Sequence, residues 1–229
     1  MSTVKVTDII RRVEDVLQDT NIRWPRTELQ NWMNESYLAI TLARPDANAK
    51  TGSFTCATGT RQVLSSEFPS SLRLLDVTRN LATNSGYKVI RLVARSVLDD
   101  QRPAWHAETG TTAIQHFTFD PRQPKEFFVY PPATTAAEIE VVYTDSPGAT
   151  TLTESQLDPA GSDPTVILLD DIYMSPMIDW ILYRAYSKDA EYGANEQRAQ
   201  AAYGAFNAAL ATKNQVDSAV SPSNMSSVT

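Results

Sequence analysis

Apolar residues near the start of the sequence recur at the spacing of an α-helix. The first stripe consists of Ile9, Ile10, Val13 and Leu17. Intervals of three and four residues place these side chains on one helical face. Thr7 precedes the stripe and is expected to cap the helix, because its hydroxyl can accept a hydrogen bond from a free backbone N–H.

A second helix is expected from Pro25, since proline suits the first position of a helix. Its apolar face consists of Leu29, Trp32, Met33, Tyr37 and Ile40. The helix should end before Pro45, because the residue that precedes a proline avoids the α-helical region. Two short helices bury little surface alone, so we expect them to pack on another part of this chain or on another chain.

Between about residues 51 and 146 the apolar positions change to a period of two, which indicates strands. We predict strands over residues 51–57, 61–65, 72–81, 87–93, 116–119, 127–130 and 137–143, with one helical turn over 96–101. In the last strand, Ile139 and Val141 should point to one side and Glu138 and Glu140 to the other. The first two strands flank Thr58-Gly59-Thr60, which predicts a hairpin.

The helical period returns in the C-terminal third of the chain. Eight of the ten residues in Met177–Tyr186 are apolar or aromatic, so this helix should be buried on more than one side. The predicted subunit interface consists of Met177, Trp180, Ile181 and Tyr183. Asp171 or Ser175 is expected to cap this helix, and Asn195 the next one, whose apolar edge contains Tyr203, Phe206 and Leu210.

The predicted fold class is α+β, with an antiparallel β-domain inserted into a helical module. Residues 1–46 and 171–213 supply the N- and C-terminal helices of the module, and residues 47–146 form the β-domain as a small sandwich or barrel. Residues 147–170 are rich in Pro, Gly, Ser, Thr and Asp and are expected to be a linker or loop. Residues 214–229 are polar and rich in Ser, so an extended C-terminal tail is expected.

Charge is unevenly distributed along the sequence. The formal net charge is −7, and residues 150–229 contribute −6 of it from four basic and ten acidic side chains. No cluster of Lys and Arg is dense enough to neutralise a run of phosphates, so sequence-specific DNA binding is not expected. An acidic surface could face DNA that slides past without sticking, or could simply keep the protein soluble.

Membrane insertion and secretion are not expected. No apolar run is long enough to span a bilayer, and no apolar segment typical of a secretory signal follows Met1. Cys56 is the single cysteine, so no internal disulfide can form, and we interpret it as a small buried hydrophobe.

The sequence lacks the residues of common catalytic sites, so we predict no enzymatic activity and no cofactor. Its two histidines, His106 and His116, are too few for a three-histidine metal site, and no phosphate-binding glycine loop is present. His106 follows Trp105 and is interpreted as a hydrogen-bonded loop histidine beside a packing tryptophan. The acidic pairs Asp99-Asp100, Asp170-Asp171 and Glu138…Glu140 leave glycoside hydrolysis as an alternative.

Five segments resemble one family when they are taken together in order. They are Arg23-Trp24-Pro25, residues 44–50, residues 102–106, residues 118–122 running on to 128–132, and residues 183–192. This combination resembles the head-to-tail adaptor, or connector, proteins of short-tailed bacteriophages. The resemblance runs from about Val4 to about Leu210. The resemblance also identifies packing and loop-motif residues, which are Trp24, Trp105, His106 and Tyr130.

The resemblance implies a structural virion protein that forms a ring of about a dozen copies in the phage neck. Such a ring joins the portal protein to the tail nozzle or tail fibre proteins and extends the channel for double-stranded DNA, which passes only as cargo. The protein would be made in the host cytoplasm and would not bind membrane. The tail is expected to dock on the portal through its spaced apolar residues, which are Val216, Val220, Pro222, Met225 and Val228.

Two alternatives from other classes remain open on the sequence. One is a tail-associated cell-wall hydrolase that uses paired carboxylates. The other is a soluble binding module that never joins the virion. Lysis of peptidoglycan by the purified chain would indicate the first, and absence of the chain from purified virions would indicate the second.

Overall fold

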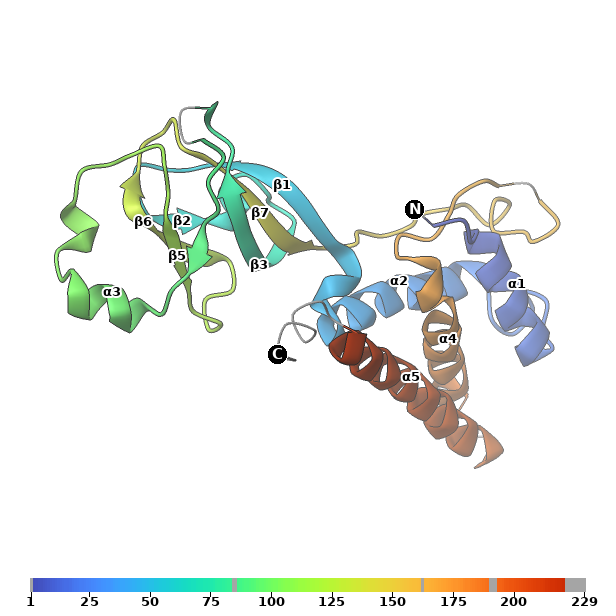
Figure 1. Ribbon diagram of the computed structural model, residues 1–229. Coiled ribbons are helices and arrows are strands. Elements are labelled where there is room, and N and C mark those ends of the chain that lie inside the picture. The colour runs from blue at the N-terminus through green and yellow to red at the C-terminus, as the bar shows by residue number, and fades with distance from the viewer. Residues whose placement is uncertain (1, 84–85, 162, 190–192, 221–229) are drawn as a thin grey trace. The chain divides into compact units, whose positions relative to one another are not determined.

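The computed structural model describes residues 2–83, 86–161, 163–189 and 193–220, with residues 214–220 described by their backbone alone. The chain divides into two compact units. Residues 1–47 and 147–229 form a helical unit, and residues 48–146 form a β unit. The predicted α+β class, with helices at both ends and an antiparallel-rich β-domain between them, is confirmed (Figure 1).

The helical unit is built on long helices from both ends of the chain. Its helices are α1 (Val6–Leu17), α2 (Arg26–Ala43), α4 (Met174–Lys188) and α5 (Gly193–Val220). Helices α4 and α5 lie side by side as a hairpin, and α2 packs against α4 (Figure 1).

The apolar stripes predicted for α1 and α2 form much of the core of this unit. The side chains of Ile9, Ile10 and Val13 are fully buried. The five residues predicted for the apolar face of α2 are also buried. They are Leu29, Trp32, Met33, Tyr37 and Ile40. They pack on apolar residues of α4 and α5 in a single cluster, so the predicted helical faces are confirmed.

The start of α1 differs from the prediction. Thr7 lies inside the helix, while Lys5 occupies the capping position without a side-chain hydrogen bond. The backbone N–H of Val6 donates instead to the carbonyl oxygen of Thr165, at 3.0 Å. A backbone partner from a distant segment therefore satisfies this N–H, and the predicted Thr7 cap was wrong.

Residues 147–170, predicted as a linker or loop, pack on the helical core. Leu157, Ile167 and Leu169 are buried in it. Asn34 of α2 also holds the segment, since its amide exchanges two hydrogen bonds of 2.9 Å with the backbone of Thr150. The segment therefore belongs to the helical unit.

The β unit contains two sheets within the described residues. The first has the order β1-β7-β3, formed by β1 (Ala49–Thr55), β7 (Glu138–Asp145) and β3 (Ser71–Asn80). The second has the order β2-β6-β5-β4, formed by β2 (Gly59–Val63), β6 (Glu126–Ala133), β5 (His116–Phe119) and β4 (Arg91–Leu92). Adjacent strands are antiparallel except β4 and β5, and a short helix, α3 (Arg95–Gln101), follows β4.

Side chains from both sheets fill the core of the β unit. Phe54 of one sheet meets Phe127 of the other, with ring centroids 5.6 Å apart. Ile139 and Val141 of the central strand β7 are fully buried, whereas Glu138 is exposed. The predicted alternation along β7 is therefore confirmed.

The predicted hairpin at Thr58-Gly59-Thr60 was wrong, because β1 pairs with β7 while β2 pairs with β6. The turn carries the chain from one sheet to the other. The side chain of Gln62 accepts a hydrogen bond from the N–H of Ala57 and donates one to its carbonyl oxygen. This amide supplies the contacts that a paired strand would have made.

Candidate functional site

Two of the four residues predicted at the subunit interface lie inside the molecule. Met177 and Ile181 are fully buried in the core of the helical unit. Because their own chain covers these side chains, they leave no surface for a neighbouring subunit, which corrects this part of the prediction. Trp180 and Tyr183 are only partly buried, so the predicted interface reduces to these two residues.

Trp180 and Tyr183 belong to a cluster of rings between α4 and α5, which we call the aromatic face. Its members are Trp180, Tyr183, Tyr203 and Phe206. The ring centroids of Trp180 and Phe206 are 5.0 Å apart, as are those of Tyr183 and Tyr203. Phe206 is 3% exposed and Tyr203 is 43% exposed, so the aromatic face runs from the core to the surface.

Two polar groups at the aromatic face lack a partner among the described residues. The indole N–H of Trp180 is buried and makes no hydrogen bond there. The partly buried carboxylate of Asp179 makes neither a hydrogen bond nor an ion pair within the same residues, and burial raises its pKa. Because an unpaired polar group is costly to bury, the partly exposed carboxylate of Asp179 is a candidate for contact with a second molecule.

The sequence carries a signal for Asp179, although hydrophobic periodicity does not reveal it. Asp179 is one of two charged residues within Met177–Tyr186, and the other, Arg184, pairs with Glu35 at 2.9 Å. Asp179 is thus an acid without a charged partner inside a largely apolar segment, and such a residue points to a contact with another molecule. Tyr203 was predicted only as part of an apolar helix edge.

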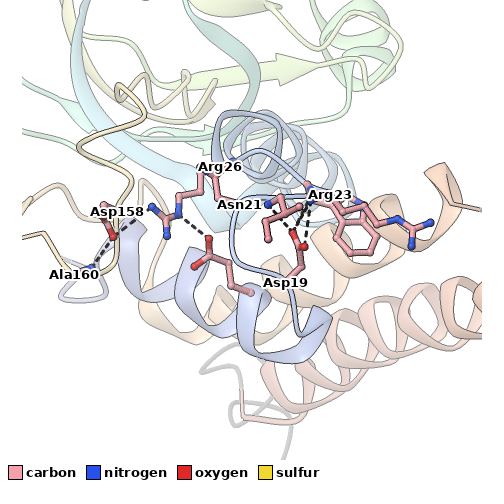
Figure 2. A network of polar contacts seen from close by, with 9 residues as sticks. Asp19, Asn21, Arg23, Arg26, Asp158 and Ala160 are labelled. Atoms are coloured by element: carbon pink, nitrogen blue, oxygen red, sulfur yellow. Dashed lines mark hydrogen bonds and ion pairs between the residues drawn. The ribbon is translucent and has the colours of Figure 1, made fainter.

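One carboxylate organises the loop between α1 and α2 (Figure 2). Asp19 accepts hydrogen bonds from the backbone N–H groups of Ile22, Arg23 and Trp24. Their lengths are 3.2, 3.0 and 3.2 Å, respectively. These bonds fix the loop while the side chain of Ile22 remains 86% exposed.

Arg26 connects three segments of the helical unit (Figure 2). Its Nε donates to Glu14 of α1 at 2.7 Å, and its Nη1 lies 3.3 Å from Oδ1 of Asp158. The side chains of Arg26 and Glu14 are only 12% and 9% exposed. The hydrogen bond to Glu14 raises the pKa of Arg26. Trp24, a motif residue, is 7% exposed and packs in the same core.

A pocket of about 540 Å³ lies beside this loop. It is lined by Val16, Leu17, Gln18, Asp19, Arg23, Trp24, Tyr186, Asp189, Asn195 and Arg198. Arg23 lies over the ring of Trp24 at 5.2 Å, and Arg198 lies over the ring of Tyr186 at 5.7 Å. Asp189 forms an ion pair with Arg23, so its charge is already compensated and the pocket has no evident acid–base pair.

The motif residues of the β unit form a second contact group. Trp105 is fully buried, and the ring of His106 stacks on it with centroids 3.7 Å apart. Nδ1 of His106 lies 2.8 Å from the hydroxyl of Thr60, and the hydroxyl of Tyr130 donates to Glu108 at 3.1 Å. These contacts give His106 a packing environment rather than a catalytic one.

One carboxylate of each acidic pair considered for glycoside hydrolysis makes structural contacts. Asp99 accepts a hydrogen bond from the indole N–H of Trp105 at 2.9 Å. Glu140 forms an ion pair with Arg79 at 3.0 Å, and Asp171 binds the backbone of the N-terminal segment. Each of these acids is thus engaged in holding the fold.

The C-terminal segment differs from the predicted extended chain. Helix α5 continues through residues 214–220, so the expectation of an extended arm is wrong for this part. Residues 214–220 contain neither Pro nor Gly, and Pro222 follows two residues after the last described helical position. Val216 and Val220 lie on this helix, whereas Pro222, Met225 and Val228 lie outside the described residues.

The described part of the chain contains no helix that is both long and apolar enough to cross a membrane. The same part contains no group of three or more His, Cys, Asp or Glu side chains placed to hold a metal ion. Cys56 is 2% exposed, and burial raises its pKa to about 12. The interpretation of Cys56 as a small buried hydrophobe is therefore confirmed.

Comparison with protein families gives one match that covers nearly the whole chain. The family model of the SU10 adaptor protein matches residues 4–226. The chain belongs to the SU10 adaptor protein family. This is a structural family of phage head–tail adaptors, so the predicted resemblance and the prediction of no enzymatic activity are both confirmed.

As a member of this family, the adaptor is a component of the virion neck and interacts with other phage neck proteins. A search of curated proteins found no match to the chain.

Proposed function

We propose that this adaptor assembles into a closed ring of about a dozen copies that joins the portal protein to the tail nozzle. The ring extends the channel through which double-stranded DNA passes as cargo. The chain is made in the host cytoplasm and is then incorporated into the neck. Membership of the adaptor family supports the location, and the aromatic face supports the self-association.

The aromatic face has the composition of a protein–protein contact. Tyrosine and tryptophan are enriched in interfaces because they bury a large apolar area and still offer a hydrogen-bonding group. Tyr203 is 43% exposed, and the buried indole N–H of Trp180 has no acceptor in the described part of the chain. A neighbouring copy that covers this face would bury the exposed ring of Tyr203.

A charged substitution on the aromatic face tests the ring. Tyr203→Glu places a carboxylate at an exposed position of α5, so the helical unit should still fold. Ala201→Glu adds the same charge at an exposed position of the same helix, on the side turned away from Tyr203, and is the matched control. Sedimentation velocity and electron microscopy of the purified chains measure ring formation.

We expect the wild type and Ala201→Glu to form closed rings, and Tyr203→Glu to associate at least about thirty-fold more weakly, the size of an interface hot spot. A wild-type chain that stays monomeric at every concentration would contradict the ring. Equal association of the two variants would remove the aromatic face from the contact.

We further propose that residues 214–229 dock on the portal protein. Apolar side chains spaced along this segment, such as Val216 and Val220, are suited to shallow pockets, and repetition around a ring would multiply weak contacts. Deletion of residues 215–229 should leave a folded protein that forms rings but does not co-sediment with portal-bearing capsids. If the truncated chain still joined portal-bearing capsids normally, another surface of the protein would be the one that docks on the portal.

A further inference from the structure

The β unit carries an exposed segment, residues 86–97, that we call the basic edge. Four of its six large apolar side chains are exposed. Tyr87 is 55% exposed, Val89 68%, Leu92 65% and Val97 40%. A group of exposed apolar side chains of this size on one segment indicates a binding surface.

The charges on the basic edge all have one sign. Lys88, Arg91 and Arg95 lie within residues 86–97, and no acidic residue does. Arg95 is 3.4 Å from Asp99. In contrast, the side chains of Lys88 and Arg91 make no hydrogen bond or ion pair with any residue that the structure describes. Two cations are thus available to a partner.

The backbone of the basic edge is held on both sides. The N–H of Ile90 donates to Thr78 of β3 at 3.0 Å, and the N–H of Arg91 donates to Gln115 at 3.1 Å. These bonds fix the backbone at Ile90 and Arg91, and a hollow of about 330 Å³ lies beside it. The hollow is lined by Lys88, Val89, Arg91, Ala113, Ile114, Gln115 and His116.

A complementary surface exists on the helical unit. Residues 48–146 contain ten basic and ten acidic side chains, whereas the rest of the chain contains ten basic and seventeen acidic ones. The whole net charge of −7 therefore belongs to the helical unit. On that unit, Asp179 is an unpaired acid next to Trp180 and one helical turn from Tyr183.

We propose that the basic edge of one copy binds the aromatic face of a second copy, with Asp179 paired to Arg91 or Lys88. This inference rests on the proposed ring and names its seam. Each side offers what the other lacks, since the basic edge has unpaired cations among aliphatic side chains and the aromatic face has an unpaired acid among rings. A guanidinium can both bond a carboxylate and lie on an aromatic ring. Two different surfaces meeting head to tail are what a closed ring requires.

Charge reversal on each side tests this seam. Arg91→Glu and Asp179→Lys place like charges opposite each other in a ring of identical variant copies, so each variant alone should associate at least about ten-fold more weakly than the wild type. Matched controls are Arg122→Glu on the β unit and Glu196→Lys on α5, both at exposed positions. Thermal melting verifies folding, and Asp179→Asn replaces Asp179→Lys if the lysine prevents folding.

Mixing the variants shows whether the pairing lies between copies. When Arg91→Glu and Asp179→Lys chains alternate around a ring, every seam again joins opposite charges. An equimolar mixture should therefore restore rings that neither variant forms alone, and the double variant should form rings by itself. Sedimentation velocity of the purified full-length chains measures both.

The outcomes separate this seam from the ring itself. Rings formed by both single variants as well as by the wild type, together with loss of rings in Tyr203→Glu, would keep the ring and overturn the pairing. Failure of the mixture to restore assembly would also overturn it. A wild-type chain that is always monomeric would reject the ring and the seam together.

Discussion

Asp171 holds Thr3 through both polar groups of that residue. Its carboxylate oxygens accept hydrogen bonds from the backbone N–H of Thr3 at 2.9 Å and from the hydroxyl of Thr3 at 2.6 Å. The same carboxylate accepts hydrogen bonds from the hydroxyl of Ser2 and the N–H of Val4. Asp171 was one of two residues predicted to cap the helix that follows it, but it fixes the N-terminal segment instead.

These hydrogen bonds, led by those from Ser2 and Thr3, hold the pKa of Asp171 well below its usual range. A carboxylate with a lowered pKa stabilises the fold above its unfolded pKa of about 3.9, and this contribution is lost as the pH falls toward the folded value. Asp171→Asn should therefore melt a few degrees below the wild type at pH 7. The difference should shrink below about pH 4.

Amide hydrogen exchange checks the location of this effect, because Thr3 and Val4 should exchange faster in Asp171→Asn. Asp170→Asn is the control, since the side chain of Asp170 makes no hydrogen bond or ion pair within the described ranges. Equal melting and exchange in the two variants would show that the carboxylate of Asp171 does not hold this segment.

Removal of one member of the Glu14–Arg26 pair should be strongly destabilising. Both side chains are largely buried, so Glu14→Ala leaves the guanidinium with only the 3.3 Å contact to Asp158. We expect a loss of about 3 kcal/mol in the free energy of unfolding. The exposed pair of Arg11 with Asp8 is the comparison, and Arg11→Ala should cost less than about 0.5 kcal/mol. Urea unfolding measures both, and similar losses would refute the difference in burial as their cause.

Asp19→Ala should loosen the loop between α1 and α2. The substitution removes the acceptor for three backbone N–H groups that precede α2, and a cost of about 1–2 kcal/mol is expected from comparable caps. Asp19→Asn keeps one acceptor oxygen and should cost less. Thermal unfolding gives the ranking, and a fully stable Asp19→Ala would mean that the loop is held by its other contacts.

Ile181→Asp should unfold the helical unit rather than disrupt assembly alone. Ile181 is fully buried, and an unpaired carboxylate in that core costs about 4 kcal/mol or more. Ile181→Val removes one methyl group and should cost about 1 kcal/mol. Circular dichroism of the purified variants measures folding. A folded Ile181→Asp variant that forms no rings would show that Ile181 contributes to the subunit interface.

Hydrophobic periodicity was sufficient to predict the buried face of a helix where one face is apolar and the other is polar. The stripe from Leu29 to Ile40 follows this pattern and is buried as predicted. The stripe Met177–Tyr186 showed only that more than one side is covered. The side of this helix that faces the core is determined by its contacts with α2 and α5. The sequence of the helix alone therefore could not show that Ile181 is buried while Tyr183 is partly exposed.

Long-range pairing was the other limit of the sequence. The hairpin at Thr58-Gly59-Thr60 was predicted from a turn between two strands, but the partner of β1 is β7, which lies more than eighty residues away. A turn sequence reports only its own backbone preference. The side chain of Gln62, which closes this turn, carried no pattern that distinguished it from an ordinary strand residue.

The pairing of β1 with β7 brings the two ends of the β unit next to each other, which is the geometry of an inserted domain. Ala49, at the start of the unit, lies opposite Thr144, near its end, and paired strands are only about 5 Å apart. The chain thus enters and leaves this unit at neighbouring points, so a short turn can replace residues 49–144 with little loop-closure entropy. Lengthening, replacing or deleting residues 49–144 would therefore leave the contacts between α2, α4 and α5 in place.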